Sequence, residues 1–393
     1  MAITLSQLCY NTATKYNMHL AAGRRGMGNT VRWVHMIEDR QVPEFLHGNE
    51  LVFTTGIGHV GSDPLLNFVK KLNEYRAAGV VINIGPYLSH IPEDVIDYCN
   101  QTDFPIFTIP WQTYIIDVIY DLCRRIIENE ESEAAVSEVF KKLITAPETW
   151  GEISPELERQ GFSNLNSYTV LSLRFLKEGK NVTSQFVELH ILQLWNLLAK
   201  ATLPAAMFMM QERLVIIRQS TSKNLIAHLE ASLAKAMAAA TTGYAMGVSS
   251  EEKGFERIPE LLRQADSARI TAEMRNNKIF FYEDIGINKL LLGINDHPDI
   301  LRSVSEEYLN PILAYDRENG TKLARLLYEY LMLDGSVQAV ADRLGLHRNT
   351  VNSRMKQIKQ LFRFELTGQK KTELLLAFQA KEVYDYMRLN GGN

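Results

Sequence analysis

Apolar side chains recur every three or four residues in three successive segments near the C-terminal end of the chain. This spacing is typical of α-helices with one buried face, and it predicts helices over 322–333, 337–344 and 348–362. Ser336 stands where the second helix needs an N-cap, and Gly345 stands where its end favours a positive φ. The side chains expected to face inward are Leu323, Leu326, Leu327, Tyr330, Leu331, Val337, Val340, Ala341, Leu344, Val351, Met355, Ile358 and Phe362.

The second and third of these helices have the pattern of a helix-turn-helix. Ala341 and Gly345 lie four positions apart, where a small residue lets two helices cross closely and a glycine makes the turn. The third helix would then place its N-terminal end in the major groove of DNA. The alternative to a DNA-contacting surface is a solvated helix face beside a structural helical hairpin. His347 can be a core residue, a helix cap or a phosphate contact. The residues expected to contact DNA are His347, Arg348, Asn349, Thr350, Asn352, Ser353 and Lys356.

The distribution of charge favours a nucleic-acid partner more than the net charge of −4 does. The segment 321–393 holds 12 basic and 7 acidic residues, whereas the rest of the chain holds 30 basic and 39 acidic residues. Within 336–363 the basic residues outnumber the acidic ones by six to one. The positive charge is therefore concentrated on the expected helix-turn-helix.

Strand and helix patterns alternate in the N-terminal third, which predicts an α/β domain with a mostly parallel sheet. Strands are expected over 31–38, 50–56, 80–85 and 104–110, with helices over 63–79 and 92–103. Small ligands bind beyond the carboxyl ends of such strands. Each candidate taken alone can instead be a turn or packing residue. The ligand-contact candidates are Thr54, Thr55, Asn83 and Thr108, with Arg32, Trp33 and Glu50 nearby in sequence.

The glycines before the first of these strands, Gly23, Gly26 and Gly28, are expected to form a flexible start. They precede a strand rather than follow one, so they lack the strand–turn–helix context of a nucleotide-binding fingerprint.

A long, Glu-rich helix is predicted from 111 to 146. Seven of its positions alternate spacings of four and three and five of them are apolar, which is compatible with a short coiled coil in which Asn129 sets the register. A plain inter-domain helix packed on one neighbour is the alternative. The positions concerned are Leu122, Ile126, Asn129, Glu133, Val136, Phe140 and Leu143.

A third unit, over 167–293, mixes strands and helices. Strands are expected over 168–175, 205–210, 213–219 and 244–249, and helices over 185–200, 224–238 and 258–274.

The segment AVADRLGLHRNTVNSRMKQIKQL closely resembles the C-terminal helix-turn-helix of PucR-type (purine catabolism regulator) transcription factors, and GRRGMGNTVRWVHMIEDRQVPEFLHGNELVFTTGIG resembles their N-terminal domain. The middle unit resembles the degenerate GGDEF-like domain found between them. The resemblance implies a multidomain chain: an α/β ligand-sensing domain over 1–112, a helical linker or coiled coil over 113–148, a GGDEF-like α+β domain over 149–295 and a helix-turn-helix bundle over 296–393. A final helix would pack through Leu376, Ala380, Val383, Tyr384 and Met387.

By the same resemblance, we expect a ligand-responsive regulator that binds double-stranded operator DNA. We expect a homodimer or higher homo-oligomer because one helix-turn-helix covers only a few base pairs and regulators pair two across half-sites. Its effector would be a purine or a breakdown product such as a ureide, and it would control genes for catabolism of that compound. A diguanylate cyclase carries two glycines on the hairpin that here reads MMQERL, and both are missing although Glu212 remains. We therefore expect no enzyme activity. The alternatives are a nucleotide-handling enzyme built on the middle unit and a signalling scaffold without a DNA target.

The remaining patterns exclude several other classes of protein. There is no GxSxG, HExxH or Walker loop, and the nine histidines are scattered, so neither a catalytic set, a metal site nor a cofactor is expected. Cys9, Cys99 and Cys123 form no CxxC pair, which argues against a disulfide framework. No long apolar run and no signal peptide are visible, so we expect a cytoplasmic protein without membrane contact.

Overall fold

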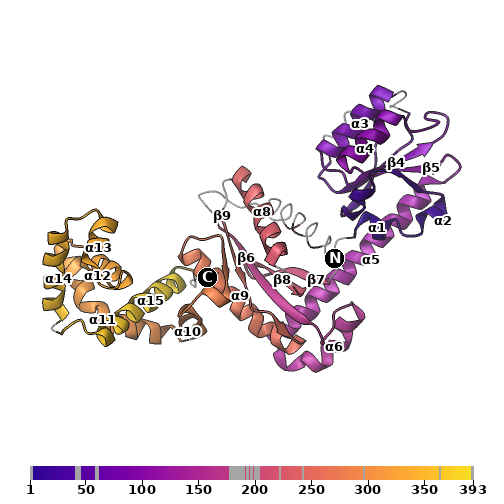
Figure 1. The fold of residues 1–393 in the computed structure, drawn as a ribbon. Coiled ribbons are helices and arrows are strands. Elements are labelled where there is room, and N and C mark those ends of the chain that lie inside the picture. Colours follow the sequence, from indigo (N-terminus) through magenta and orange to yellow (C-terminus); the bar gives the residue numbers. More distant parts are fainter. Residues whose placement is uncertain are drawn as a thin grey trace. The chain divides into compact units, whose positions relative to one another are not determined.

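The computed structural model describes residues 3–39, 46–57, 62–176, 191, 194, 198, 204–220, 223–240, 243–294, 297–362 and 364–390. The chain forms two compact units, Met1–Tyr244 with Glu251–Leu262, and Ala245–Ser250 with Arg263–Asn393. Figure 1 shows the elements of both. The predicted helix over 185–200 lies largely outside the described residues, although Ile191, Leu194 and Leu198 are helical.

The N-terminal sheet has the strand order β1-β5-β4-β3-β2. The pairs β2–β3, β3–β4 and β4–β5 are parallel and β1 is antiparallel to β5, so the expected mostly parallel sheet is confirmed. Strand β1 and the short helices before it were not predicted. The elements are α1 (Leu5–Leu8), α2 (Thr12–Tyr16), β1 (His19–Ala22), η1 (Arg24–Gly28), β2 (Trp33–Met36), β3 (Glu50–Thr54), α3 (Ser62–Glu74), β4 (Gly79–Ile84), α4 (Glu93–Thr102) and β5 (Ile106–Pro110).

Helices cover both faces of this sheet, because alternate strand residues point to opposite sides and both sets are apolar. Val52 and Val80 lie in one core cluster with Phe68 of α3 and Cys99 of α4. Their strand neighbours form a second cluster on the other face, which α1 and the first half of α5 (Ile115–Thr145) cover. The result is a three-layer α/β domain.

The glycines expected to form a flexible start are instead held by close packing. Arg24–Gly28 is a 3₁₀ helix, and Gly23 before it has φ +75°. A Cβ atom on Gly23 would lie 2.0 Å from the carbonyl oxygen of Phe104, and one on Gly26 would lie 2.0 Å from that of Asp103. Only residues without a side chain allow this approach, so the expectation of flexibility was wrong for Gly23 and Gly26.

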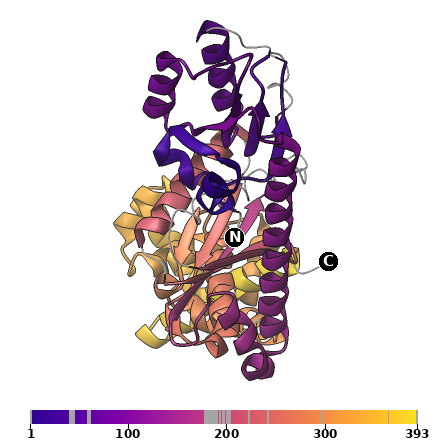
Figure 2. The ribbon, with the colours of Figure 1, turned by 90° about the vertical axis from the view of Figure 1, so that its right-hand side faces the viewer.

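Helix α5 runs without interruption, as Figure 2 shows. Of the positions proposed for a coiled coil, Leu122, Ile126, Val136, Phe140 and Leu143 are buried within this one chain. The alternative of a helix packed on its own neighbours therefore holds for that stripe.

Polar contacts of Asp121 and Arg125 tie α5 to the N-terminal helices. The Asp121 carboxylate lies 2.9 Å from Arg125 and 3.3 Å from Lys15. Arg125 also donates to the backbone carbonyls of Leu8 and Tyr10. Burial alone raises the pKa of Asp121, but the charges of Arg125 and Lys15 bring that pKa below its ordinary value.

The second sheet has the strand order β11-β9-β6-β8-β7, with β10 paired to β6. The four predicted strands and the helices predicted over 224–238 and 258–274 appear in the structure. Between β7 and β8 the chain turns at Gln211, whose φ is +55°. The elements are η3 (Pro147–Thr149), α6 (Trp150–Arg159), β6 (Ser167–Leu176), β7 (Ala205–Met210), β8 (Arg213–Gln219), α8 (Lys223–Ala240), β9 (Gly243–Val248), β10 (Glu252–Lys253), η4 (Phe255–Arg257), α9 (Ile258–Met274), β11 (Ile279–Phe281) and η5 (Tyr282–Asp284).

The C-terminal part is helical and packs around two apolar clusters. Leu309 and Ile312 of the first long helix lie in one of them with Leu374 and Ala377 of the last. Further along the last helix, Ala380 and Val383 lie in a second cluster, against which Leu376, Tyr384 and Met387 pack. The packing face expected for the final helix is therefore confirmed. The helices are α10 (Asn288–Gly293), α11 (Pro298–Asn319), α12 (Leu323–Met332), α13 (Val337–Leu344), α14 (Arg348–Phe362) and α15 (Gly368–Asn390).

None of the helices that the structure describes combines the length and the apolar character needed to cross a membrane.

Candidate nucleic-acid interface and ligand cleft

Helices α13 and α14 begin and end at the residues that the sequence pattern predicted. The Ser336 hydroxyl accepts a hydrogen bond from the N–H of Ala339 at 3.3 Å, which caps the start of α13. Gly345 follows the helix with φ +62°, and the N–H of Leu346 donates to the carbonyl of Ala341 at 2.9 Å. This closure satisfies the last carbonyls of α13 and turns the chain into α14.

The apolar stripe of α14 anchors it to the other helices. Val351, Met355, Ile358 and Phe362 are all buried in the cluster formed with α11, α12, α13 and α15. The expected inward face is therefore confirmed, and the opposite face of α14 is left to solvent. On α13, Val337 and Leu344 are half-buried rather than fully covered.

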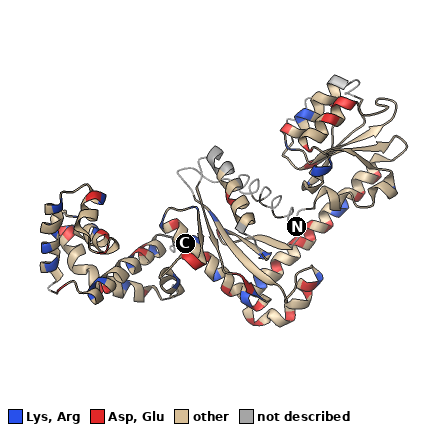
Figure 3. Cartoon of the chain, viewed as in Figure 1, with Lys and Arg blue, Asp and Glu red and all other residues tan. Residues whose placement is uncertain are grey.

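The candidate DNA-contact residues gather on the open side of α14. All except the half-buried Thr350 are exposed, and Figure 3 shows basic residues along this helix. Among the described residues of α14, Arg348, Arg354, Lys356 and Lys359 are basic and none is acidic. The exposed candidates are His347, Arg348, Asn349, Asn352, Ser353 and Lys356.

His347 acts as a helix cap. Its Nδ1 atom accepts a hydrogen bond from the backbone N–H of Asn349 at 3.2 Å, and its carbonyl accepts from the N–H of Thr350 at 2.9 Å. Of the three roles open for this residue, the cap is present in the structure and a core position is not, because the side chain is exposed.

Polar contacts from α11 and α12 also hold the helix-turn-helix, and sequence reasoning missed them. Both carboxylate oxygens of Asp316 accept from backbone N–H groups at the start of α12, at 2.7 Å from Leu323 and 2.9 Å from Ala324. Gln357 of α14 donates to the Tyr315 hydroxyl at 2.6 Å. Neither contact can be predicted from the spacing of residues along one helix, because its two partners lie on different helices.

The seven ligand-contact candidates lie at two opposite edges of the N-terminal sheet. Trp33 pairs with Glu50 at the amino ends of the parallel strands β2 and β3, and Arg32 precedes them. Thr54 ends β3, so it lies at the carboxyl edge. The structure does not bring these two sets together. The candidates at the carboxyl edge are Thr54, Thr55, Asn83 and Thr108.

Three of these four already have partners within the domain. The Thr54 hydroxyl donates to Glu38 Oε2 at 3.1 Å, and the Thr55 N–H donates to Glu38 Oε1 at 2.7 Å. The buried Asn83 side chain donates to the carbonyl of Pro110 at 3.1 Å. Glu38 was missed, although it follows β2 as Thr55 follows β3.

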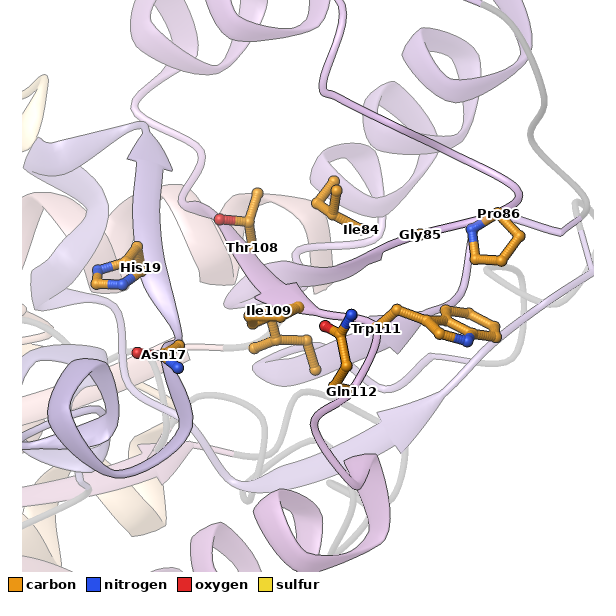
Figure 4. A pocket seen from close by; sticks show the side chains of 10 residues that line it. Asn17, His19, Ile84, Gly85, Pro86, Thr108, Ile109, Trp111 and Gln112 are labelled. Carbon is orange, nitrogen blue, oxygen red and sulfur yellow. The ribbon is translucent and has the colours of Figure 1, made fainter.

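Thr108 lines a cleft of about 590 Å³ at the carboxyl end of β4 and β5. Figure 4 shows it between β1 on one side and the turn at Gly85 and Pro86 on the other. Of this lining the sequence predicted only Thr108, and Asn17 and His19 were missed because β1 was not predicted. The lining residues are Asn17, His19, Ile84, Gly85, Pro86, Thr108, Ile109, Pro110, Trp111 and Gln112.

Two segments match known protein families. Residues 7–126 match the Purine catabolism regulatory protein-like family, and residues 323–380 match the PucR C-terminal helix-turn-helix domain. The chain carries both PucR domains. The N-terminal PucR match extends through the first half of α5, which completes the core on one face of the sheet. The C-terminal PucR match begins at the first residue of α12 and ends within α15.

Two curated proteins of Bacillus subtilis (strain 168) are similar to parts of this chain. The Purine catabolism regulatory protein is 29% identical over 119 residues, which are 30% of this chain and 22% of that protein. The Proline-responsive transcriptional activator PutR is 30% identical over 108 residues, which are 28% of this chain and 26% of that protein. The chain thus matches about a quarter of the length of these relatives.

A crystal structure of a regulator of polyketide synthase expression from Bifidobacterium adolescentis is similar at 14% identity. The aligned part covers 65% of this chain and 99% of that chain, with a TM-score of 0.30.

Proposed function

We propose that this protein is a DNA-binding transcription regulator with α14 as its recognition helix. The observation that carries the proposal is the exposed polar and basic face of α14, set opposite a buried stripe and next to the tight turn at Gly345. The match of residues 323–380 to the PucR helix-turn-helix domain supports it.

Base reading falls to the residues nearest the N-terminal end of α14, because that end enters the major groove. Arg348 has the donors for the O6 and N7 atoms of guanine, and Asn349 and Asn352 have the paired donor and acceptor that adenine requires. All three side chains are exposed.

Phosphate contacts fall to His347, Ser353 and Lys356 on the same face. Because Nδ1 of His347 is occupied by the cap, its Nε2–H is the group free to donate to a phosphate. Thr350, which is half-buried, lies between the two sets.

The test compares three alanine variants in operator and random duplexes at several salt concentrations. Arg348→Ala should cost roughly 1–3 kcal/mol on the operator and relax specificity at one position. Lys356→Ala should weaken all sequences alike and lower the salt slope by about one contact. Arg302→Ala is the matched control, because Arg302 is an exposed basic residue near the start of α11, where it pairs with Glu306 at 2.8 Å. If Arg348→Ala and Lys356→Ala bind like the control, α14 is not the recognition helix.

We further propose that the N-terminal domain responds to a small effector and that the regulated genes serve catabolism of a nitrogen compound. The PucR match and the name of the purine-related relative support a purine or ureide, whereas the name of the second relative indicates proline. A thermal-shift screen with purines, ureides, sugar acids and amino acids tests this, because a bound ligand raises Tm by mass action.

A second copy of this chain is the proposed protein partner, since helix-turn-helix regulators bind paired half-sites. The proposed surface is the outer face of α5, where Ile116, Tyr120 and Ile127 are 69%, 72% and 44% exposed at spacings of four and seven. Asp117 and Arg124 flank Tyr120, so two antiparallel copies of α5 can place opposite charges together.

For the middle domain we propose a structural role in place of cyclase chemistry, and the GGDEF-like fold remains a proposal. Glu212 lies on the β7–β8 hairpin, and its carboxylate forms an ion pair with Arg174 of β6 at 2.7 Å. Incubation with GTP and Mg²⁺ tests this proposal, and formation of a cyclic dinucleotide would contradict it.

A further inference from the structure

The cleft of the N-terminal domain has a fixed aromatic wall. A Cβ atom on Gly85 would lie 2.6 Å from the Trp111 ring, so the indole packs directly on the Gly85 backbone. Tyr87 meets the same indole edge-on, with ring centroids 5.7 Å apart. Trp111 nevertheless remains 42% exposed. One part of the ring is thus held by the protein while the remainder is open to a ligand.

Polar groups of several kinds surround the cleft without being used by the protein. The β1–β5 register places His19 opposite Thr108, and Asn17 and Gln112 lie at the rim (Figure 4). These four side chains make no hydrogen bond to any described residue. A hydroxyl, an imidazole and two amides can both donate and accept, which suits a ligand with several amide-like groups.

Among the described residues, the lining includes no Asp, Glu, Lys or Arg. The nearest basic residue in sequence, Lys15, is already paired with Asp121 at 3.3 Å and lies over the Tyr16 ring at 4.9 Å. A carboxylate, phosphate or ammonium group that entered the cleft would give up part of its water and, beside the His19 ring, would meet no permanently charged partner among these lining residues. The chemistry of the lining therefore favours an uncharged ligand.

Hydrogen bonds brace the rim, and the chain leads from it directly into α5. The Asn83 side chain holds the carbonyl of Pro110 at 3.1 Å, and the Thr113 hydroxyl donates to the carbonyl of Tyr16 at 3.2 Å. Trp111 and Gln112 are followed almost directly by the first residue of α5, Ile115. The cleft wall is therefore continuous with this helix, and its shape is set before a ligand binds.

We propose that this cleft is the effector site and that it takes an uncharged, flat ring compound with amide or lactam groups, stacked on Trp111. The inference rests on the proposed effector response and narrows its chemistry. Stacking fills the open part of the indole, while Thr108, His19 and the two rim amides satisfy the polar groups of the ring. A zwitterionic amino acid such as proline does not fit this description.

The experiment is isothermal titration of the full chain, without DNA, against neutral lactam heterocycles, each beside its carboxylated analogue, and against proline. The variants are Trp111→Leu, Trp111→Phe and Thr108→Val, with Trp150→Leu as the matched control. Trp150 is 40% exposed, close to the 42% of Trp111, but it lies on α6 and not in the lining of the cleft. Circular dichroism confirms that each variant is folded.

A neutral heterocycle should bind the wild type and the control equally, with an affinity that does not depend on salt. Trp111→Leu should weaken binding by roughly tenfold or more, Trp111→Phe should restore part of the loss, and Thr108→Val should weaken it a few-fold. Tighter binding of the carboxylated analogues or proline, no binding by any neutral compound, or equal binding by Trp111→Leu and Trp150→Leu would each overturn the proposal. Because operator binding is measured on α14 variants, failure of the DNA-binding proposal is seen separately.

Discussion

The Nδ1 atom of His347 accepts a hydrogen bond from the backbone N–H of Asn349 at 3.2 Å, so a residue of the proposed DNA surface also caps the helix that carries it. An N–H at the first turn of a helix has no partner within the helix, and a side-chain acceptor there stabilises the helix start. The contact requires Nδ1 without a proton, which leaves the proton of the neutral ring on Nε2.

Substitution of His347 should separate capping from DNA binding. His347→Ala loses both groups and should lower the free energy of unfolding by about 1 kcal/mol as well as weaken operator binding. His347→Ser keeps a capping oxygen, so it should retain stability while losing the phosphate contact. Chemical denaturation and operator titration of both variants measure the two effects. Wild-type operator affinity in His347→Ser would limit His347 to its capping role.

Gly345 should be intolerant of a side chain for reasons of backbone conformation alone. Its φ is +62°, yet a Cβ atom there would have open space within 4 Å. Gly345→Ala should therefore cost about 1–2 kcal/mol of stability, and Gly345→Asn should cost less because asparagine tolerates the left-handed region. Unfolding curves of the two variants provide the comparison. Equal stability of Gly345→Ala and wild type would show that the turn has a different conformation.

The thiol of Cys99 should be inert in the folded protein. Burial raises its pKa to about 12, so the reactive thiolate is scarce at neutral pH. In the unfolded chain the Cys99 thiol has a pKa of about 8.5. Between that pH and about 12 the folded protein therefore keeps a proton that the unfolded chain loses. The stabilisation that comes with this difference in pKa is fully present below about pH 8.5 and is lost as the pH rises toward about 12. Alkylation at Cys99 followed by mass spectrometry should track unfolding, and rapid labelling of native protein would contradict the burial.

A charge on the outer face of α5 should weaken self-association. Tyr120→Lys places an ammonium group on the exposed stripe, where a dimer would have to bury it without a partner. Tyr10→Lys is the control, because Tyr10 is 69% exposed in the same domain and off α5. Sedimentation should show a dimer for wild type and Tyr10→Lys and a shift toward monomer for Tyr120→Lys. A monomeric wild type, with and without operator, would remove the dimer proposal.

The sequence by itself determined the helix-turn-helix, because the features that specify it are local. The Ser336 cap, the Gly345 turn and the stripe from Val351 to Phe362 each act within a few residues, and all three are in the structure as predicted. The alternating strands of the N-terminal domain were predictable for the same reason, since both faces of a covered parallel sheet are apolar.

Only the tertiary structure decided which surface covers an apolar stripe and which residues share a cleft. The stripe of α5 with Leu122 and Phe140 indicated a buried face, but periodicity does not reveal whether the covering surface belongs to the same chain or to a second copy. Likewise, β1 joins the sheet by pairing His19 with Thr108, 89 positions away. Four residues paired at that distance carry no local signal, so the cleft between Asn17 and Trp111 exists only once the strand order is set.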